Sequence, residues 1–471
     1  MKGSEKSMLD CVDHGGYIVI SRKEENGDKQ QTIHYAYDFK QGKLSLHLFE
    51  NVPEVNGENL VIGTSFDNKK YLFGTQIPIS LFEYGMFPSN YNQEVDFVIK
   101  GYEPQSAYTE AIFDFDELQY FCPSPAVVKS DDKNNVIFSR ERIDVKEFQI
   151  DINLIKCNVK FIVAAKGKWG FAHSNMEAVT EIHVVFPETR DIDFLRKIYL
   201  TVDCVFAFIC NRRNTTCRSM RLIGKYPSKT ISDGKIVDCE KICNSEMFFF
   251  DKYREEPEEQ KIIAKAWDAA MMLKHIDSLF NIVAEDISGK LNEGGNISIS
   301  SIHPSTKRRN LIDLQQSVQI ISAFEFYARR YYKDMISEKD HHIIMKMILE
   351  EIQGKTKGKM KELAKNMSDN VVREPALKDK VWKIYKGYEG HTSIKNCLSE
   401  EWFKSDEIQM LAKEANDWRN ELAHSKRSHE PSINTIMAVR MIEHFNYAII
   451  LREIGFDDEE ILNLLGAILK R

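Results

Sequence analysis

The chain has 471 residues, of which 43% are hydrophobic and 29% are charged, and its net charge is -7 at pH 7. This length exceeds what one hydrophobic core normally serves, so we expect two or three domains of an ordinary globular protein. The negative balance argues against non-specific wrapping of nucleic acid, and any RNA contact must come from a local basic patch. No run of about 18 apolar residues is present, so we expect no membrane span.

The chain contains nine cysteines. An odd number spread over a long chain favours reduced thiols in the cytoplasm over a disulfide framework. The first residues, MKGSEKSMLDCVDHGG, include no apolar segment, so we also expect no secretory signal. Together these features predict a cytoplasmic location.

The first half of the chain has the pattern of a β domain. Short runs rich in Val, Ile, Phe and Tyr alternate with Gly, Asn, Asp and Lys turns, which is typical of antiparallel sheet. The expected strands are 17–21, 43–49, 59–66, 69–74, 94–102, 158–167 and 181–186, with a final pair around 217–224 and 246–253. An apolar helix over 190–214 interrupts them and should be buried against the sheet.

The second half changes to a helical period after a charged linker at 254–261. Apolar residues recur every three or four positions from Ile262 to Val283 and from Leu311 to Ala328. Further helices are expected around 341–353, 356–367, 377–388, 399–424 and 432–453. We therefore predict an α+β protein of two domains. A β-rich, antiparallel and sandwich-like domain at 1–253 is followed by an all-α bundle at 254–471.

The segment NDWRNELAHSKRSHEP, residues 416–431, ends one of the long helices with a polar group. The apolar stripe of that helix consists of Ile408, Leu411, Ala415, Trp418 and Leu422. At about 100° per residue, Arg419 falls at the edge of the stripe, whereas Asn420 and His424 fall on the opposite face. Asn420 and His424 are i and i+4 neighbours and can reach one ligand. Such a pair fits a shared surface, where a dimer would bring together two Arg, two Asn and two His.

These side chains are sufficient for metal-free RNA cleavage. Histidine has an ordinary pKa near 6.5 and can take a proton from a 2'-hydroxyl or give one to the departing 5'-oxygen. Arginine stays charged and grips phosphate with a forked guanidinium. Asparagine can orient the phosphate or the imidazole. The products would be a 2',3'-cyclic phosphate and a 5'-hydroxyl, and we expect no metal and no other cofactor.

The motif Arg419-Asn420-Glu421-Leu422-Ala423-His424 resembles the arginine, polar residue and histidine signature of the HEPN superfamily of RNases. The segment AFEFYARRYY (323–332) resembles the Apea-like branch of that superfamily, and the β-rich half, with NLVIGTSFDNKKYLFGT and FDELQYF, resembles the N-terminal domain of ApeA-type antiviral proteins. The resemblance implies a homodimeric, metal-independent endoribonuclease of abortive antiphage defence, acting on tRNA or another RNA. It also implies that the β-rich domain senses a phage-derived trigger.

A second interpretation stays open: the bundle is a catalytically silent dimerisation module, and the β-rich domain binds a protein or a glycan. The six-residue motif is short, and a solvated helix end, where histidine and lysine interact well with the helix dipole, has the same pattern. Incubation with tRNA in EDTA distinguishes the two interpretations.

Several further residues are weighed against simpler roles. Glu325 lies on an apolar stripe, so we expect it either to form a buried pair with Arg419 or to pair with Arg329 or reach solvent at the rim. Lys426, Arg427 and His429 follow the motif and could hold flanking RNA phosphates, although a charged loop is commonly only solvated.

Cys210, Cys217, Cys239 and Cys243 could form a zinc site, but their spacing is unlike that of zinc knuckles.

Overall fold

A computed structural model describes residues 14–24, 27–38, 42–48, 55–81, 89–122, 128–130, 136–138, 143–169, 174–212, 214–232, 235–250, 269–289, 314–331, 340–371, 376–387, 392–423 and 431–469. The chain divides into two compact units. The N-terminal unit is Met1–Asp203 with Thr215–Glu256, and the helical unit is Cys204–Asn214 with Pro257–Arg471. The domain limit predicted at 253/254 lies outside the described residues and stays a prediction.

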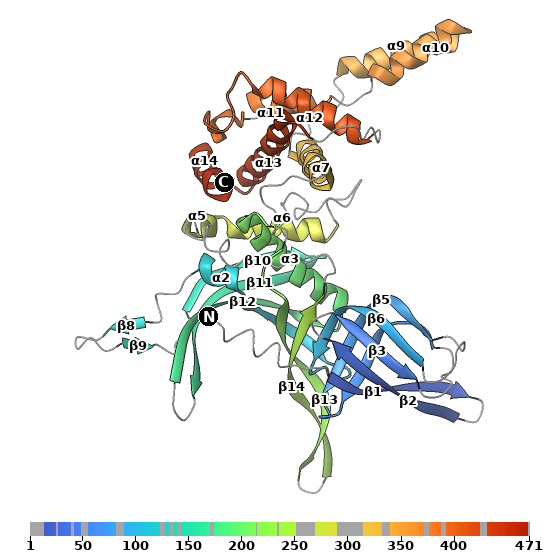
Figure 1. Ribbon diagram of the computed structural model, residues 1–471, viewed down its shortest axis with the longest axis vertical. Helices are drawn as coiled ribbons and strands as arrows, with labels where there is room; N and C mark the ends of the chain where they lie inside the picture. Colours follow the sequence, from blue (N-terminus) through green and yellow to red (C-terminus); the bar gives the residue numbers. More distant parts are fainter. Residues whose placement is uncertain are drawn as a thin grey trace. The chain divides into compact units, whose positions relative to one another are not determined.

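The N-terminal unit is built on antiparallel sheet (Figure 1). Its strands are β1 (His14–Glu24), β2 (Gly27–Asp38), β3 (Lys43–Leu48), β4 (Val55–Ser65), β5 (Lys70–Leu81), β6 (Ser89–Lys100), β7 (Ala107–Phe113), β8 (Val128–Ser130), β9 (Val136–Phe138), β10 (Ile143–Ile152), β11 (Ile155–Trp169), β12 (Ser174–Thr189), β13 (Ser219–Ser232) and β14 (Lys235–Phe249). Twelve of these strands form one sheet in the order β10-β11-β12-β7-β13-β14-β6-β3-β2-β1-β4-β5, and β8 pairs with β9. The predicted antiparallel β-rich class is confirmed.

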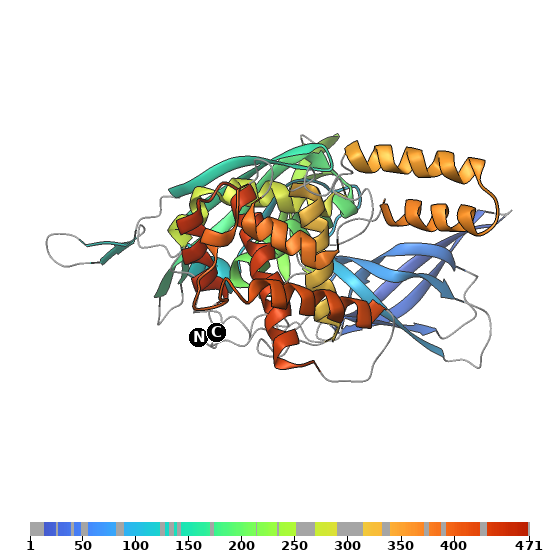
Figure 2. The same cartoon turned by 90° about the horizontal axis from the view of Figure 1, so that it is seen from above.

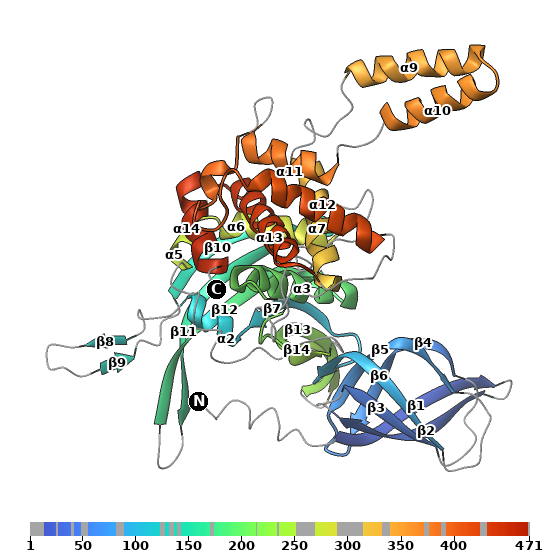
Figure 3. The same ribbon diagram turned by 45° about the horizontal axis from the view of Figure 1, so that its top comes forward.

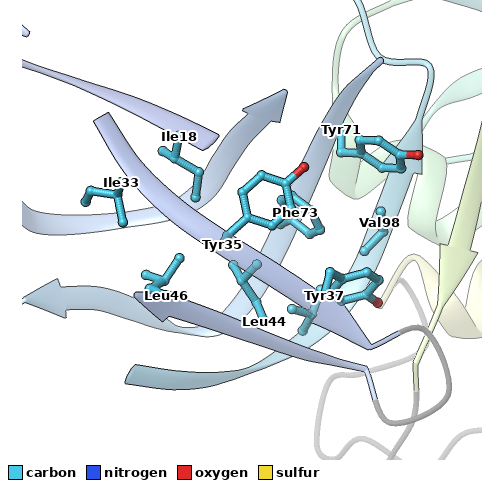
Figure 4. Close-up of a cluster of buried hydrophobic side chains, with 10 residues drawn as sticks. Ile18, Ile33, Tyr35, Tyr37, Leu44, Leu46, Tyr71, Phe73 and Val98 are labelled. Atoms are coloured by element: carbon cyan, nitrogen blue, oxygen red, sulfur yellow. The ribbon is translucent and has the colours of Figure 1, made fainter. Parts of the chain in front are cut away.

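Strands β1 to β6 close into a barrel, because β6 pairs with β3 along one part and with β5 along the other. The barrel encloses a core in which Tyr35 and Phe73 meet edge to face with ring centroids 5.3 Å apart (Figure 4). Gly63 makes room for this tyrosine, since a Cβ there would lie 2.7 Å from Tyr35 Cε1.

The remaining strands extend from the barrel through β14, which pairs with β6 from Phe97 to Lys100. The predicted pairing of the strands near 217–224 and 246–253 is confirmed, because Met220 of β13 lies opposite Met247 of β14. Strands β2, β7, β8, β9 and β10 were not among the predicted strands, and a short helix, α2 (Asp116–Phe121), follows β7.

The predicted apolar helix over 190–214 is confirmed as α3 (Ile192–Cys210). Its first part is buried in the N-terminal unit, where the Tyr199 ring stacks on Phe249 with centroids 3.6 Å apart. From Cys204 onward the helix belongs to the helical unit, in which Phe208 stacks on Tyr447 at 4.6 Å. Only the first part of the helix therefore satisfies the expectation of burial against the sheet.

The helical unit contains α5 (Ala269–Lys274), α6 (Ile276–Ile287), α7 (Leu314–Tyr331), α9 (Asp340–Lys355), α10 (Lys359–Val371), α11 (Leu377–Lys386), α12 (Ile408–Ala423), α13 (Ile433–Glu453) and α14 (Asp458–Leu469). Helix α13 is buried along most of its length, and α7, α12 and α14 pack on it (Figures 1 and 3). This surrounded, largely apolar helix provides the core of the predicted bundle.

Two predicted helices differ in the structure, and one helix was not predicted. The single helix expected from Ile262 to Val283 is broken at His275, whose ring packs against Phe456 at 4.6 Å and against Gly455. Residues 399–407 form turns before α12 rather than its first helical turns. Helix α14, which the sequence analysis did not include, covers α13 with Ile461, Leu464 and Leu465, all buried.

In the part of the chain that the structure describes, none of the helices combines the length and the apolar character needed to cross a membrane.

Candidate active site

Helix α12 presents the predicted stripe to the core. Ile408, Leu411, Ala415 and Trp418 are buried, and Leu422 is half-buried. Arg419 and Asn420 are exposed, as expected for positions at the edge of the stripe and beyond it. Arg419 Nη1 donates a long hydrogen bond of 3.4 Å to Asn420 Oδ1. The two side chains therefore lie together on the outer side of the bundle.

The predicted contact between Glu325 and Arg419 is present. Arg419 Nη2 lies 3.3 Å from Glu325 Oε2 and joins α12 to α7. The sequence analysis expected a buried pair, but 18% of the Glu325 side chain and 47% of the Arg419 side chain are exposed. The other candidate partner, Arg329, has a side chain outside the described residues.

The exposure of Glu325 follows from the orientation of α7. The predicted stripe between Leu311 and Ala328 is confirmed at Ile321 and Ala328, which are buried, but Leu314 and Val318 are exposed. The centre of the buried face passes through Ser317, Ile320, Phe324 and Tyr327. The bulky ring of Phe324 sets this orientation by packing on Phe445 of α13, and Asn446 donates to the carbonyl of Ile320 at 3.0 Å. Glu325 consequently lies about 100° from Phe324, at the margin of the buried face.

A residue that the sequence analysis did not select completes the arrangement. Lys380 of α11 is 2% exposed, and its Nζ lies 3.7 Å from Glu325 Oε1. The carboxylate of Glu325 thus lies between a buried ammonium and a half-exposed guanidinium. The clue in the sequence was the position of Lys380 within the apolar series Leu377, Val381 and Ile384, where an unpaired lysine would be costly.

The middle of α12 is hydrogen-bonded to the start of α13. Ser432 caps α13 by accepting from the Thr435 amide at 3.0 Å, as the predicted helix start at Pro431-Ser432 requires. Thr435 Oγ1 donates to Glu414 Oε1 of α12 at 2.5 Å. These bonds connect the two helices that flank residues 424–430.

Four of the predicted site residues lie outside the described residues: His424, Lys426, Arg427 and His429. His424 directly follows Ala423, the last residue of α12. The structure therefore brings together Arg419, Asn420 and Glu325, and the roles predicted for His424 and the basic residues after it stay predictions.

The four cysteines considered for zinc do not form a metal site. Cys239 and Cys243 are both on β14, and four residues along a strand span about 13 Å. That separation is too large for two thiolates on one zinc ion, whose Zn–S bonds are about 2.3 Å. Among the residues that the structure describes, no group of three or more His, Cys, Asp or Glu side chains could hold a metal ion.

The fold and the site define an α-helical domain with an arginine and an asparagine held on the outer face of its penultimate long helix. Residues 318–460 match the family described as Apea-like HEPN, so the C-terminal part of this chain is similar to Apea-like HEPN domains. HEPN domains are commonly ribonucleases, and they typically dimerise and bind RNA. No curated protein and no solved structure matches the chain significantly.

The family match includes α7, α11, α12 and α13 and thus every described residue of the candidate site. It confirms the resemblance predicted for the C-terminal half. It does not extend to the N-terminal unit, whose resemblance to ApeA-type antiviral proteins stays a prediction.

Proposed function

We propose that this protein is a metal-independent endoribonuclease whose active site is completed at a homodimer interface. The observation that carries the proposal is the state of Arg419. Its guanidinium is held by Glu325 at 3.3 Å, yet nearly half of the side chain faces solvent beside the exposed Asn420. A guanidinium that is both fixed in position and accessible to solvent can bind the phosphate of an RNA backbone. A guanidinium with a purely structural role would have no need of this exposure.

In the proposed reaction, the imidazole of His424 accepts the proton of a ribose 2'-hydroxyl. The 2'-oxygen attacks phosphorus, the bond to the 5'-oxygen breaks, and an imidazolium gives that oxygen its proton. Arg419 stabilises the charge on the phosphoryl oxygens, and Asn420 positions the phosphate or the imidazole. Two copies would supply two imidazoles, so that one acts as base while the other acts as acid.

We further propose the biological setting that the family resemblance implies. The substrate would be tRNA or another structured or single-stranded RNA in the cytoplasm. Lys426, Arg427 and His429 would bind flanking phosphates, which neutralises charge without reading sequence. The N-terminal unit would sense a phage-derived trigger and release the activity in abortive defence.

One observation favours the second candidate, a HEPN dimerisation module without catalysis that carries a protein- or glycan-binding β-rich domain. Leu314 and Val318 are 42% and 45% exposed on the same side of α7 as Glu325. Exposed apolar side chains next to a polar rim are typical of a protein interface. Dimerisation without catalysis would therefore account for the exposure of Leu314 and Val318.

The deciding experiment is the incubation of purified protein with total tRNA in EDTA. Fragments that end in 2',3'-cyclic phosphate and 5'-hydroxyl support the ribonuclease. RNA that stays intact for the dimeric protein, with and without added divalent metal and with candidate triggers present, supports the dimerisation module.

A further inference from the structure

Helices α9 and α10 form an antiparallel hairpin within the helical unit (Figure 2). Leu349 and Ala364 are buried between the two helices. Six larger apolar side chains remain between 39% and 60% exposed: Met345, Ile348, Ile352, Met360, Leu363 and Met367. We call these six residues the hairpin face.

The two helices contribute to the hairpin face with the same spacing. Met345, Ile348 and Ile352 of α9 follow one another at three and four residues, as do Met360, Leu363 and Met367 of α10. Residues at this spacing lie along one side of a helix, so the face is a pair of parallel stripes rather than scattered side chains. With six large side chains about half exposed, its apolar area is on the order of 500 Å², the size of an interaction patch.

This face fits a second copy of itself. A two-helix hairpin has too little core to stabilise its helices, whereas two hairpins packed face to face give an antiparallel four-helix bundle. A twofold axis along the helices would place each α9 opposite the partner's α10. Because both helices carry the same apolar spacing, the stripes then match without a shift in register.

The charges of the two helices also match in that arrangement. Helix α9 has three carboxylates and two lysines, and α10 has three lysines and two carboxylates, so their net charges are opposite. Glu351, which pairs with Lys355 at 2.5 Å, lies on the outer flank of α9, and Lys359 lies on the outer flank of α10. Facing hairpins would therefore bring a carboxylate on one copy near an ammonium on the other.

We propose that the α9–α10 hairpin docks against the same hairpin of a second copy of this chain and forms a four-helix bundle. About 500 Å² from each copy gives a total near 1,000 Å², the lower limit of a specific interface. The contact is separate from any contact of α12, and it stands whether or not the protein cleaves RNA.

The test measures the mass of the full-length protein in solution by light scattering and analytical ultracentrifugation. Ile348→Glu and Leu363→Glu each place a charge in the hairpin face and should halve the assembly mass or raise the dissociation concentration at least tenfold. Met347→Glu is the matched control, because Met347 is 63% exposed on the other side of α9 and should leave the mass unchanged. Circular dichroism checks that all variants keep their helical content.

Three results would overturn the proposal: wild-type protein that is monomeric, Glu variants that keep the wild-type mass, or a Met347→Glu control that loses mass equally. If the protein is monomeric and Leu363→Glu weakens the binding of tRNA, the hairpin face binds RNA instead of a second copy. Cleavage of tRNA in EDTA is read separately, so failure of the ribonuclease proposal and failure of the hairpin contact are distinguishable.

Discussion

Glu325 of α7 and Arg419 of α12 meet at 3.3 Å on the rim of the helical unit, and the buried Lys380 approaches the same carboxylate from α11. The carboxylate thereby links three helices of the helical unit at the point where the Arg419–His424 motif begins. Because Lys380 is almost fully buried, removal of Glu325 leaves an ammonium in the core without this neighbouring charge.

We predict that Glu325 and Lys380 are energetically coupled. Glu325→Gln and Lys380→Met should each lower the free energy of unfolding by about 1–3 kcal/mol, because each removes one charge of the Glu325–Lys380 pair. The double variant should lose less than the sum of the two, since no buried charge remains. Denaturant unfolding of all four proteins measures the coupling, and additivity within about 0.5 kcal/mol would show that the two residues act independently.

We predict that Asn420 contributes to RNA cleavage through its position beside Arg419. Asn420→Ala should reduce the rate roughly 100-fold, as expected for the loss of one positioned donor at a reacting phosphate. Asn416 offers a matched control one turn earlier on α12, where its side-chain amide donates to Asp417 at 3.3 Å. Equal rates for Asn420→Ala and Asn416→Ala would remove Asn420 from the site.

We predict that the N-terminal unit contains a pH-dependent contact at His183. Burial acts to lower the pKa of this imidazole, but hydrogen bonds to Glu110 at 2.6 Å and to Glu181 at 3.3 Å outweigh it, so the pKa is raised. Arg221 also binds Glu181.

A raised pKa in the folded state means that the charged form is stabilised by folding. The contribution of His183 is therefore complete below its unfolded pKa near 6.5 and is lost as the pH rises through the higher folded pKa. Thermal unfolding from pH 5.5 to 9 should show wild-type protein losing stability relative to His183→Gln as the pH increases. A difference that does not change with pH would contradict the assignment.

We predict that Gly224 is required for the pairing of β13 with β7. A Cβ at this position would lie 2.2 Å from the backbone oxygen of Ala107 and 2.8 Å from Tyr108 Cα, and a backbone cannot move aside as a flexible side chain can. Gly224→Ala should therefore lower the melting temperature by several degrees or prevent folding. Gly354→Ala is the control, because nothing lies within 4 Å of its Cβ and alanine favours the helix by about 0.5–1 kcal/mol.

The sequence was most informative where periodicity is strong. The buried stripe of α12 was predicted from its spacing, because Ile408, Leu411 and Ala415 follow one another at helical intervals with no competing face. The pairing of Glu325 with Arg419 was one of two alternatives drawn from a carboxylate on an apolar helix, and the contact is present although the pair is not buried. Both inferences rest on physical rules that act over one helix or one pair of charges.

Features set by tertiary packing could not be predicted in the same way. The orientation of α7 depends on Phe324 packing against Phe445 and on polar residues buried beside it. The predicted stripe was therefore confirmed at Ile321 and Ala328 but wrong at Leu314 and Val318. Closure of the barrel depends on β5 pairing with β6, a partner that strand alternation alone does not specify. Lys380 was missed because its carboxylate partner lies 55 residues earlier in the chain, on another helix.

The central claim is that Arg419, Asn420 and His424 cut RNA without a metal. Its most direct test compares wild-type protein with His424→Ala on total tRNA in EDTA, with sequencing of the cleaved ends and a parallel measurement of dimer mass. We expect wild-type protein to give 2',3'-cyclic phosphate and 5'-hydroxyl ends, and His424→Ala to remain dimeric and leave the RNA intact. Undiminished cleavage by His424→Ala, or complete loss of wild-type cleavage in EDTA, would contradict the proposed mechanism.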